Sequence, residues 1–334
     1  MSYLSEYSRA LLNSIYSQVP AFGRIMVVCN ATSDTGLYHY QTLQELVEPQ
    51  DGRVLFFTSI QSALDECQTN NNDIICLDAN TSHKVTAQLA ITKNRIHFFG
   101  FDGGGRKIGS RALISNTGIG ATGDIAMVYN TGTGNTFHNI SFKNNWTVAQ
   151  NLYSVKEWGI QTYYENCDIS NLGSAHLSAA TAASLNLAGN EVEFKNCTIG
   201  QQSTLITSTA GQVVLISNRG SSGTKCTRSR FDNCRLQTYT SDTTHVFVRA
   251  GAVSIDKDVT LDNCEYANCG AAATGGVTLA VAVATDAGVG GNLFIGYPRV
   301  YRATQVATAA VGDTNVYLVS PTCVNTNAVG LVAV

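Results

Sequence analysis

The segment Glu193-Phe194-Lys195-Asn196-Cys197 decides the fold, because four further segments of the chain follow the same pattern. Each has an aromatic residue or leucine, a variable residue, asparagine, and then cysteine or asparagine. The five asparagines are separated by 22, 30, 37 and 30 residues, and each interval suits one coil of a solenoid. We therefore predict an all-β chain folded as a right-handed parallel β-helix. The repeat residues are Phe142 and Asn144; Tyr164, Asn166 and Cys167; Phe194, Asn196 and Cys197; Phe231, Asn233 and Cys234; and Leu261, Asn263 and Cys264.

Stacking of coils predicts where these side chains lie. Residues two apart on a strand share a face, so Phe194 and Asn196 are expected to project together into the interior. The asparagine would lie at a bend and bond to the backbone or to the asparagine of the next coil, forming a ladder. The following cysteine would stack as a small, reduced, apolar side chain.

The remaining sequence divides into three parts. Residues 1–21 predict a helical arm whose apolar face includes Tyr7, Leu11 and Ile15; it either packs on the domain or docks on a partner or sister subunit. Residues 22–270 form the β-helix, and Ser59 begins a capping helix that extends to Cys67. Residues 271–334, rich in Gly, Ala, Val and Thr, are expected to supply closing coils and a subunit contact.

Composition argues against several classes of protein. Charged residues make up only 13% of the chain and the formal net charge is −3, with no basic patch for nucleic acid or an acidic membrane. No apolar run is long enough to span a bilayer, and the first residues lack the features of a secretory signal, so we expect a soluble protein made in a cytoplasm. The ten cysteines show no metal-site spacing.

Three acidic residues are candidates for catalysis. Neighbouring coils are about 4.8 Å apart, so acids at equivalent positions could act as a carboxylate pair. Asp232 and Asp262 occupy such positions, and Glu265 follows its cysteine, but Lys143 and Lys195 fill the position of Asp232 in other coils. That position therefore reads as solvent-facing, and we expect no catalytic residue, metal or cofactor.

The segments Thr58-Ser59-Ile60-Gln61-Ser62-Ala63-Leu64, Asp73-Ile74-Ile75-Cys76-Leu77 and Asn94-Arg95-Ile96-His97-Phe98-Phe99-Gly100 resemble the entry of pectate-lyase-like β-helices. The calcium-binding acids and arginine of pectate lyases and the catalytic motifs of polygalacturonases are absent from the sequence. Only Asn166-Cys167-Asp168 has a superficial likeness to one of them, the Asn-Thr-Asp motif of polygalacturonases.

The layout of residues 22–270 is also similar to β-helical structural proteins of tailed phages. This resemblance implies a non-catalytic virion protein that decorates the capsid after assembly in the host cytoplasm. Its expected partners are the major capsid protein or other virion proteins and sister subunits in a homotrimer, with a host glycan as a further candidate. A tailspike-like polysaccharide depolymerase, either a glycoside hydrolase or a lyase, is the alternative.

Overall fold

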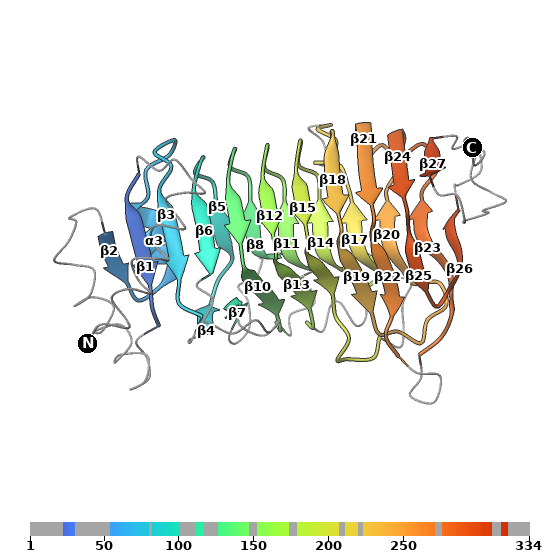
Figure 1. The fold of residues 1–334 in the computed structure, drawn as a ribbon, viewed down its shortest axis with the longest axis horizontal. Helices are drawn as coiled ribbons and strands as arrows, with labels where there is room; N and C mark the ends of the chain where they lie inside the picture. The colour runs from blue at the N-terminus through green and yellow to red at the C-terminus, as the bar shows by residue number, and fades with distance from the viewer. Residues whose placement is uncertain are drawn as a thin grey trace.

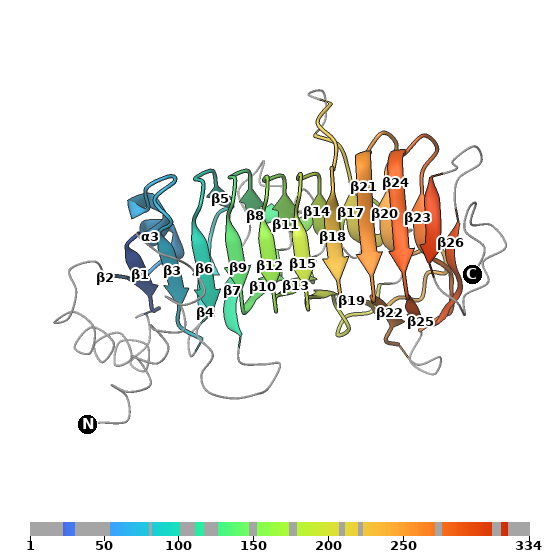
Figure 2. The ribbon, with the colours of Figure 1, turned by 45° about the horizontal axis from the view of Figure 1, so that its top comes forward.

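The computed structural model is a solenoid of three parallel sheets, which confirms the predicted fold class. It describes residues 23–30, 54–79, 82–100, 111–116, 126–146, 152–173, 179–206, 211–219, 223–270, 276–308 and 315–319. From β3 to β26 the chain contributes one strand to each sheet in turn, and the coils follow one another along the long axis of the molecule (Figures 1 and 2). Backbone hydrogen bonds therefore join residues that are one coil apart in sequence.

The strands of the three sheets are short, as expected when every coil bends three times. Sheet A, in spatial order, contains β2 (Val54–Phe57), β1 (Ile25–Val28), β3 (Ile74–Leu77), β6 (His97–Gly100), β9 (Thr136–His138), β12 (Tyr163–Glu165), β15 (Glu193–Lys195), β18 (Ser229–Asp232), β21 (Ile255–Asp262), β24 (Gly290–Gly296) and β27 (Val316–Val319). Sheet B contains β4 (Ser82–Val85), β7 (Ala112–Asn116), β10 (Ile140–Asn144), β13 (Asp168–Asn171), β16 (Thr198–Gly200), β19 (Arg235–Thr238), β22 (Glu265–Asn268) and β25 (Arg299–Tyr301). Sheet C contains β5 (Leu89–Ile91), β8 (Ala126–Asn130), β11 (Tyr153–Glu157), β14 (Ala183–Leu187), β17 (Gln212–Ile216), β20 (Val246–Ala250), β23 (Leu279–Thr285) and β26 (Ala303–Thr308).

An aromatic stack runs through the interior on the inner face of sheet A. Tyr164, Phe194 and Phe231 occupy equivalent positions in β12, β15 and β18, and Leu261 continues the row in β21. The ring centroids of Phe194 lie 4.7 Å from those of Tyr164 and of Phe231, and all three side chains are completely buried. Offset stacking of this kind adds to the free energy gained from burying the rings.

The first of the five sequence segments belongs to a different row, which corrects the predicted repeat. Phe142 and Asn144 lie in β10 of sheet B, where Asn144 pairs with Asn171. The residue aligned with Tyr164 is Phe137 of β9, and its asparagine is Asn139. The pattern of aromatic residue, variable residue and asparagine occurs twice in this coil, and spacing alone does not choose between the two copies.

The orientation of the asparagines also differs from the prediction. Asn166, Asn196, Asn233 and Asn263 are exposed, whereas the aromatic residues or leucine two positions earlier are buried. Each asparagine has a positive φ between 50° and 53°, so the chain bends there and turns the side chain outward. Asparagine tolerates this left-handed conformation better than most residues. The amides still form ladder bonds, because Asn233 Nδ2 donates to Asn196 Oδ1 at 2.7 Å and Asn263 Nδ2 donates to Asn233 Oδ1 at 3.2 Å.

A second asparagine ladder lies inside the solenoid. It forms the buried hydrogen bonds that the sequence had predicted for the asparagines of the repeat. It lies at the end of sheet B, where Asn144 and Asn171 are completely buried and Asn116 nearly so. Asn116 Nδ2 donates to Asn144 Oδ1 at 2.5 Å, and Asn144 Nδ2 donates to the carbonyl oxygen of Tyr153. These amides satisfy backbone groups at the bend into sheet C that would otherwise be buried without partners.

The cysteines of the repeat form a buried stack of free thiols. Cys167, Cys197, Cys234 and Cys264 each donate from Sγ to a carbonyl oxygen of the preceding coil, at distances from 3.3 to 3.7 Å. All nine cysteines that the structure describes are free, and of these Cys269 is exposed. The tenth, Cys323, lies outside the described residues.

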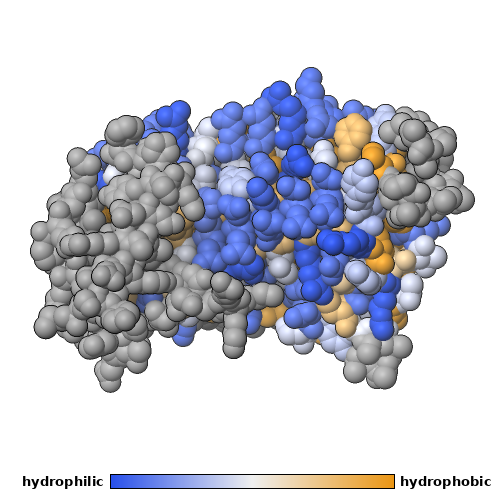
Figure 3. Space-filling model, in the orientation of Figure 1, coloured by the Kyte–Doolittle hydropathy of each residue, from blue (hydrophilic) through white to orange (hydrophobic). Residues whose placement is uncertain are grey.

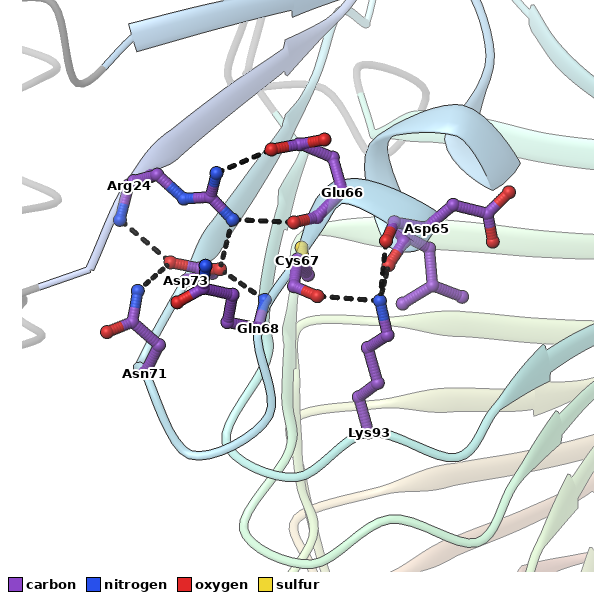
Figure 4. Close-up of polar contacts among 9 residues, drawn as sticks. Arg24, Asp65, Glu66, Cys67, Gln68, Asn71, Asp73 and Lys93 are labelled. Carbon is purple, nitrogen blue, oxygen red and sulfur yellow. Dashed lines mark hydrogen bonds and ion pairs between the residues drawn. The ribbon is translucent and has the colours of Figure 1, made fainter.

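The N-terminal end of the solenoid is covered by helix α3 (Ile60–Glu66), which buries Ile60, Ala63 and Leu64. The Ser59 side chain caps its first turn, as predicted, by accepting a hydrogen bond from the backbone N–H of Ser62. Lys93 closes the other end, because its Nζ donates to the carbonyl oxygens of Leu64, Asp65 and Cys67 at 2.6 to 2.7 Å (Figure 4). A positive charge at the C-terminal end of a helix also interacts favourably with the helix dipole.

An ionic cluster joins this helix to the first strands. The completely buried Asp73 carboxylate accepts hydrogen bonds from the backbone N–H of Arg24 and Gln68 and from the Asn71 amide (Figure 4). The Arg24 guanidinium also donates to the Glu66 carboxylate at 2.6 Å. This cluster holds the residue before β1 against the residue before β3. In sheet A, β1 lies between β3 and the later strand β2, an order that the sequence did not predict.

Strands β23 to β27 continue all three sheets beyond residue 270. The outer surface changes character there. Tyr297, Tyr301 and Val319 are exposed, and the rings of Phe294 and Tyr317 stack with centroids 5.0 Å apart. In the face shown in Figure 3, hydrophilic residues dominate the middle coils, and apolar residues gather towards this C-terminal end.

The predicted N-terminal arm, with Tyr7, Leu11 and Ile15, lies outside the described residues.

Candidate functional site

The three acids selected from the sequence do not face one common space. Asp232 and Asp262 are adjacent in register on the outer face of sheet A, whereas Glu265 lies at the start of β22 in sheet B. The Arg230 guanidinium is 2.9 Å from Asp262 and 3.7 Å from Asp232. Glu265 has its own partner, with 3.3 Å to Arg235 Nε. Each of these acids therefore lies in an ion pair with an arginine.

Two features are missing from the part of the chain that the structure describes. No group of three or more His, Cys, Asp or Glu side chains in those residues could hold a metal ion. None of the described helices is long and apolar enough to cross a membrane.

A groove of about 370 Å³ lies along the outer face of sheet B, over strands β7, β10, β13, β16 and β19. Its walls are mainly hydroxyl and amide side chains, with two leucines and three ionisable residues. The lining residues are Arg111, Leu113, Ser141, Lys143, Asp168, Ser170, Leu172, Gly200, Gln201, Gln202, Ser203 and Gln237. We call this the sheet B groove.

Asp168 is the acid that lines the sheet B groove. It begins β13, where Ser141 of β10 lies beside it in register and donates from Oγ to Asp168 Oδ2 at 3.0 Å. Burial raises the pKa of the Asp168 carboxyl, while the Ser141 hydrogen bond and the positive charges of Arg111 and Lys143 oppose that rise. With one carboxylate in its described lining, the groove lacks the acid pair that glycoside hydrolysis uses.

Two cations give the groove a net positive charge. Lys143 projects outward from β10 beside Ser170, and Arg111 precedes β7. Arg111 donates from one guanidinium nitrogen to Asn166 Oδ1 at 2.8 Å, whereas its Nε is buried and has no hydrogen-bond partner in the described residues. The groove can therefore offer charged and neutral donors to a ligand rich in oxygen atoms.

Gly200 makes the close approach of two coils possible on the floor of the groove. Its φ is +104°, and a Cβ atom added there would lie 1.8 Å from the carbonyl oxygen of Gln237 in the next coil. No larger residue fits without moving the backbone of β19. Gln201, which follows, turns its amide to the nearby loop, where its Oε1 accepts from the backbone N–H groups of Ser203 and Thr204.

Sequence reasoning missed this site. It noted Asp168 only within Asn166-Cys167-Asp168, as a superficial likeness to a known motif, and treated Lys143 as a sign of a solvent-facing position in the repeat. A usable signal exists in β10 and β13, where Ser141, Lys143, Asp168 and Ser170 alternate with apolar residues and so share the outer face. The approach of Arg111, which lies 57 residues before Asp168 in the sequence, has no local signal.

Several solved structures are similar to this chain, among them pectin methylesterases and an alginate lyase. A pectin methylesterase from Erwinia chrysanthemi is similar over 90% of this chain and 94% of its own, with 10% identity and a TM-score of 0.48. An alginate lyase from Paenibacillus sp. str. FPU-7 covers 78% of this chain and 96% of its own, with 12% identity and a TM-score of 0.41.

A protein of Geobacillus virus E2, ORF18, is similar over 76% of this chain and 58% of its own, with 12% identity and a TM-score of 0.32. At these identities the likeness concerns the fold alone, and it transfers no catalytic residue. No family model and no curated protein matches the sequence.

Proposed function

We propose that this chain is a non-catalytic structural protein of a phage virion that binds a host surface glycan in the sheet B groove. The observation that carries the binding role is the lining of the groove: hydroxyls, amides and two cations around a single carboxylate. Sugar rings are recognised by such polar groups, and the apolar faces of Leu113 and Leu172 can contact their C–H surfaces. The single acid argues for retention of a glycan over its hydrolysis.

The virion placement rests on the sequence resemblance to structural phage β-helices. We propose capsid decoration as a homotrimer, with the major capsid protein as partner. The exposed Tyr297, Tyr301 and Val319 offer one surface for subunit contact. Mass spectrometry of purified particles, separated into heads and tails, tests this placement. Recovery with heads supports decoration, and recovery with tails or in neither fraction contradicts it.

The binding role is tested with polysaccharide from the host surface and with pectin. Intact protein should be retained on the immobilised host polysaccharide without releasing reducing or unsaturated sugars. Lys143→Gln and Arg111→Gln should each weaken retention roughly tenfold, which corresponds to about 1.4 kcal/mol. Lys195→Gln, on the outer face of sheet A, is the matched control and should bind normally. Equal retention of all four proteins, or no retention of any, would contradict glycan binding in the groove.

A polysaccharide depolymerase is the second candidate, and one observation favours it. Burial raises the pKa of Asp168, whose carboxyl lies beside the hydroxyl of Ser141, and a raised pKa suits a carboxyl group that donates a proton. Release of sugars that is abolished in Asp168→Asn, while retention persists, would replace the non-catalytic assignment with this one.

A further inference from the structure

A lysine that has no counter-anion among the described residues lies on the outer face of sheet C, away from the sheet B groove. Lys156 of β11 is only 7% exposed. Its Nζ lies 3.8 Å from the ring centroid of Trp158 and 4.8 Å from that of Tyr129 on the preceding coil. In the described residues, no hydrogen bond or ion pair joins this ammonium group to an acceptor. Cation–π contacts therefore hold a charge that burial has partly stripped of water.

The two aromatic rings are held in place by their neighbours. The Tyr129 and Trp158 rings meet edge to face, with centroids 5.5 Å apart and an interplanar angle of 82°. Trp158 Nε1 donates to Asn186 Oδ1 at 3.2 Å, and the Ser217 hydroxyl donates to the same oxygen at 3.1 Å. Lys156, Tyr129 and Asn186 are in register on three adjacent coils. The arrangement is thus a preformed aromatic surface around one cation.

The charges of the described residues around Lys156 do not neutralise it. The described titratable groups that face this surface are Tyr153 on the same strand and Tyr129 and Arg219 on other coils, and none of them is an acid that is ionised at neutral pH. Glu157, the next residue, points into the interior. The segments 147–151, 174–178 and 207–210, which lead into β11, β14 and β17, contain no Asp or Glu, and Asp124 is the only acid in segment 117–125 before β8.

We propose that Tyr129, Lys156 and Trp158 form a second ligand site that binds a carboxylate-bearing sugar residue. The carboxylate would pair with Lys156, and the sugar ring would pack on the aromatic surface. Partial desolvation strengthens such a charge pair, and aromatic rings suit the C–H face of a pyranose. This site does not depend on the sheet B groove, so either site can fail without the other.

Trp158 provides the readout, because the chain has only two tryptophans and the other, Trp146, is completely buried. D-Glucuronate should change the tryptophan fluorescence of the intact protein, whereas D-glucose at the same ionic strength should not. The change should persist in Trp146→Phe and vanish in Trp158→Phe. Lys156→Gln should weaken binding roughly tenfold or more, whereas Lys156→Arg should stay within about threefold of the intact protein. Thermal unfolding of each variant checks that it is folded.

Two control variants and a pH series distinguish binding at Lys156 from binding elsewhere on the protein. Lys143→Gln, in the sheet B groove, and Asp124→Asn should leave the glucuronate response unchanged. Burial lowers the pKa of Lys156 to about 8, so the response should weaken between about pH 6.5 and about pH 9.5, and Lys156→Arg should keep it. Absence of any glucuronate response, an equal response to glucose, or normal binding by Lys156→Gln would overturn the proposal.

Discussion

The hydroxyl of Tyr164 lies 2.5 Å from Oε2 of Glu157, and both side chains are completely buried. Glu157 also accepts hydrogen bonds from the amide of Asn130, the backbone N–H of Gly159 and the hydroxyl of Thr162. No local pattern in the sequence indicated this cluster, which links the end of sheet C to the aromatic stack of sheet A.

We predict that Glu157 makes the stability of the protein depend on pH. Burial raises the pKa of Glu157 to about 7, and this effect outweighs the surrounding hydrogen bonds, which lower it. Because the folded-state pKa is raised, the contribution to stability is fully present below the unfolded pKa and is lost as the pH rises through about 7. Urea unfolding from about pH 5 to about pH 8 should show the free energy of unfolding falling by a few kcal/mol. In Glu157→Gln this fall should be much smaller, and an equal fall would assign it to other groups.

Phe194 should be one of the most sensitive positions in the core. Its ring is stacked between Tyr164 and Phe231, so Phe194→Ala removes contacts on both sides and leaves a cavity. We expect a loss of about 3 to 5 kcal/mol in the free energy of unfolding, measured with denaturant. Lys195→Ala, one residue later and on the outer face, is the control, with an expected change within about 0.5 kcal/mol. Similar losses in the two variants would mean that the stack is not the cause.

The left-handed backbone at Asn196 predicts an order of tolerated substitutions. With φ at 53°, Asn196→Ala should cost about 1 to 2 kcal/mol, whereas Asn196→Gly should cost less because glycine adopts this conformation freely. Chemical denaturation of the two variants decides the matter. If alanine proves no worse than glycine, the amide ladder with Asn233, and not the backbone, determines the choice of residue.

Most thiols should be reduced and slow to react. Of the nine described cysteines, eight are buried and Cys269 is exposed. A thiol reagent added to native protein should therefore modify Cys269 rapidly, and denaturation without reductant should release the stacked thiols of Cys167, Cys197, Cys234 and Cys264. The double variant Cys269→Ser, Cys323→Ser should lack the rapid phase. Disulfides within the stack would contradict the prediction.

The N-terminal arm is predicted from the sequence and lies outside the described residues. Deleting residues 1–21 should leave a folded β-helix that no longer binds particles or forms trimers, because a short apolar helix gains its stability from a packing partner. Truncated and intact protein can be added to particles that lack it, and the pellets compared after sedimentation. Equal binding, with an unchanged oligomer mass by light scattering, would move the attachment surface to the chain after residue 270.

The sequence by itself determined the solenoid, its capping helix and the aligned row from Tyr164 to Leu261. Those features come from patterns within a few residues that recur at coil-length intervals, and stacking then follows because each coil has open edges. The tertiary structure alone decided three other matters: the place of Phe142 and Asn144 in sheet B, the insertion of β1 between β2 and β3, and the meeting of Arg111 with Asp168. Each depends on loop lengths and on contacts between residues tens of positions apart. A left-handed residue at a bend reverses the direction of the side chain, so alternation along the sequence could not show that Asn196 points outward while Phe194 points inward.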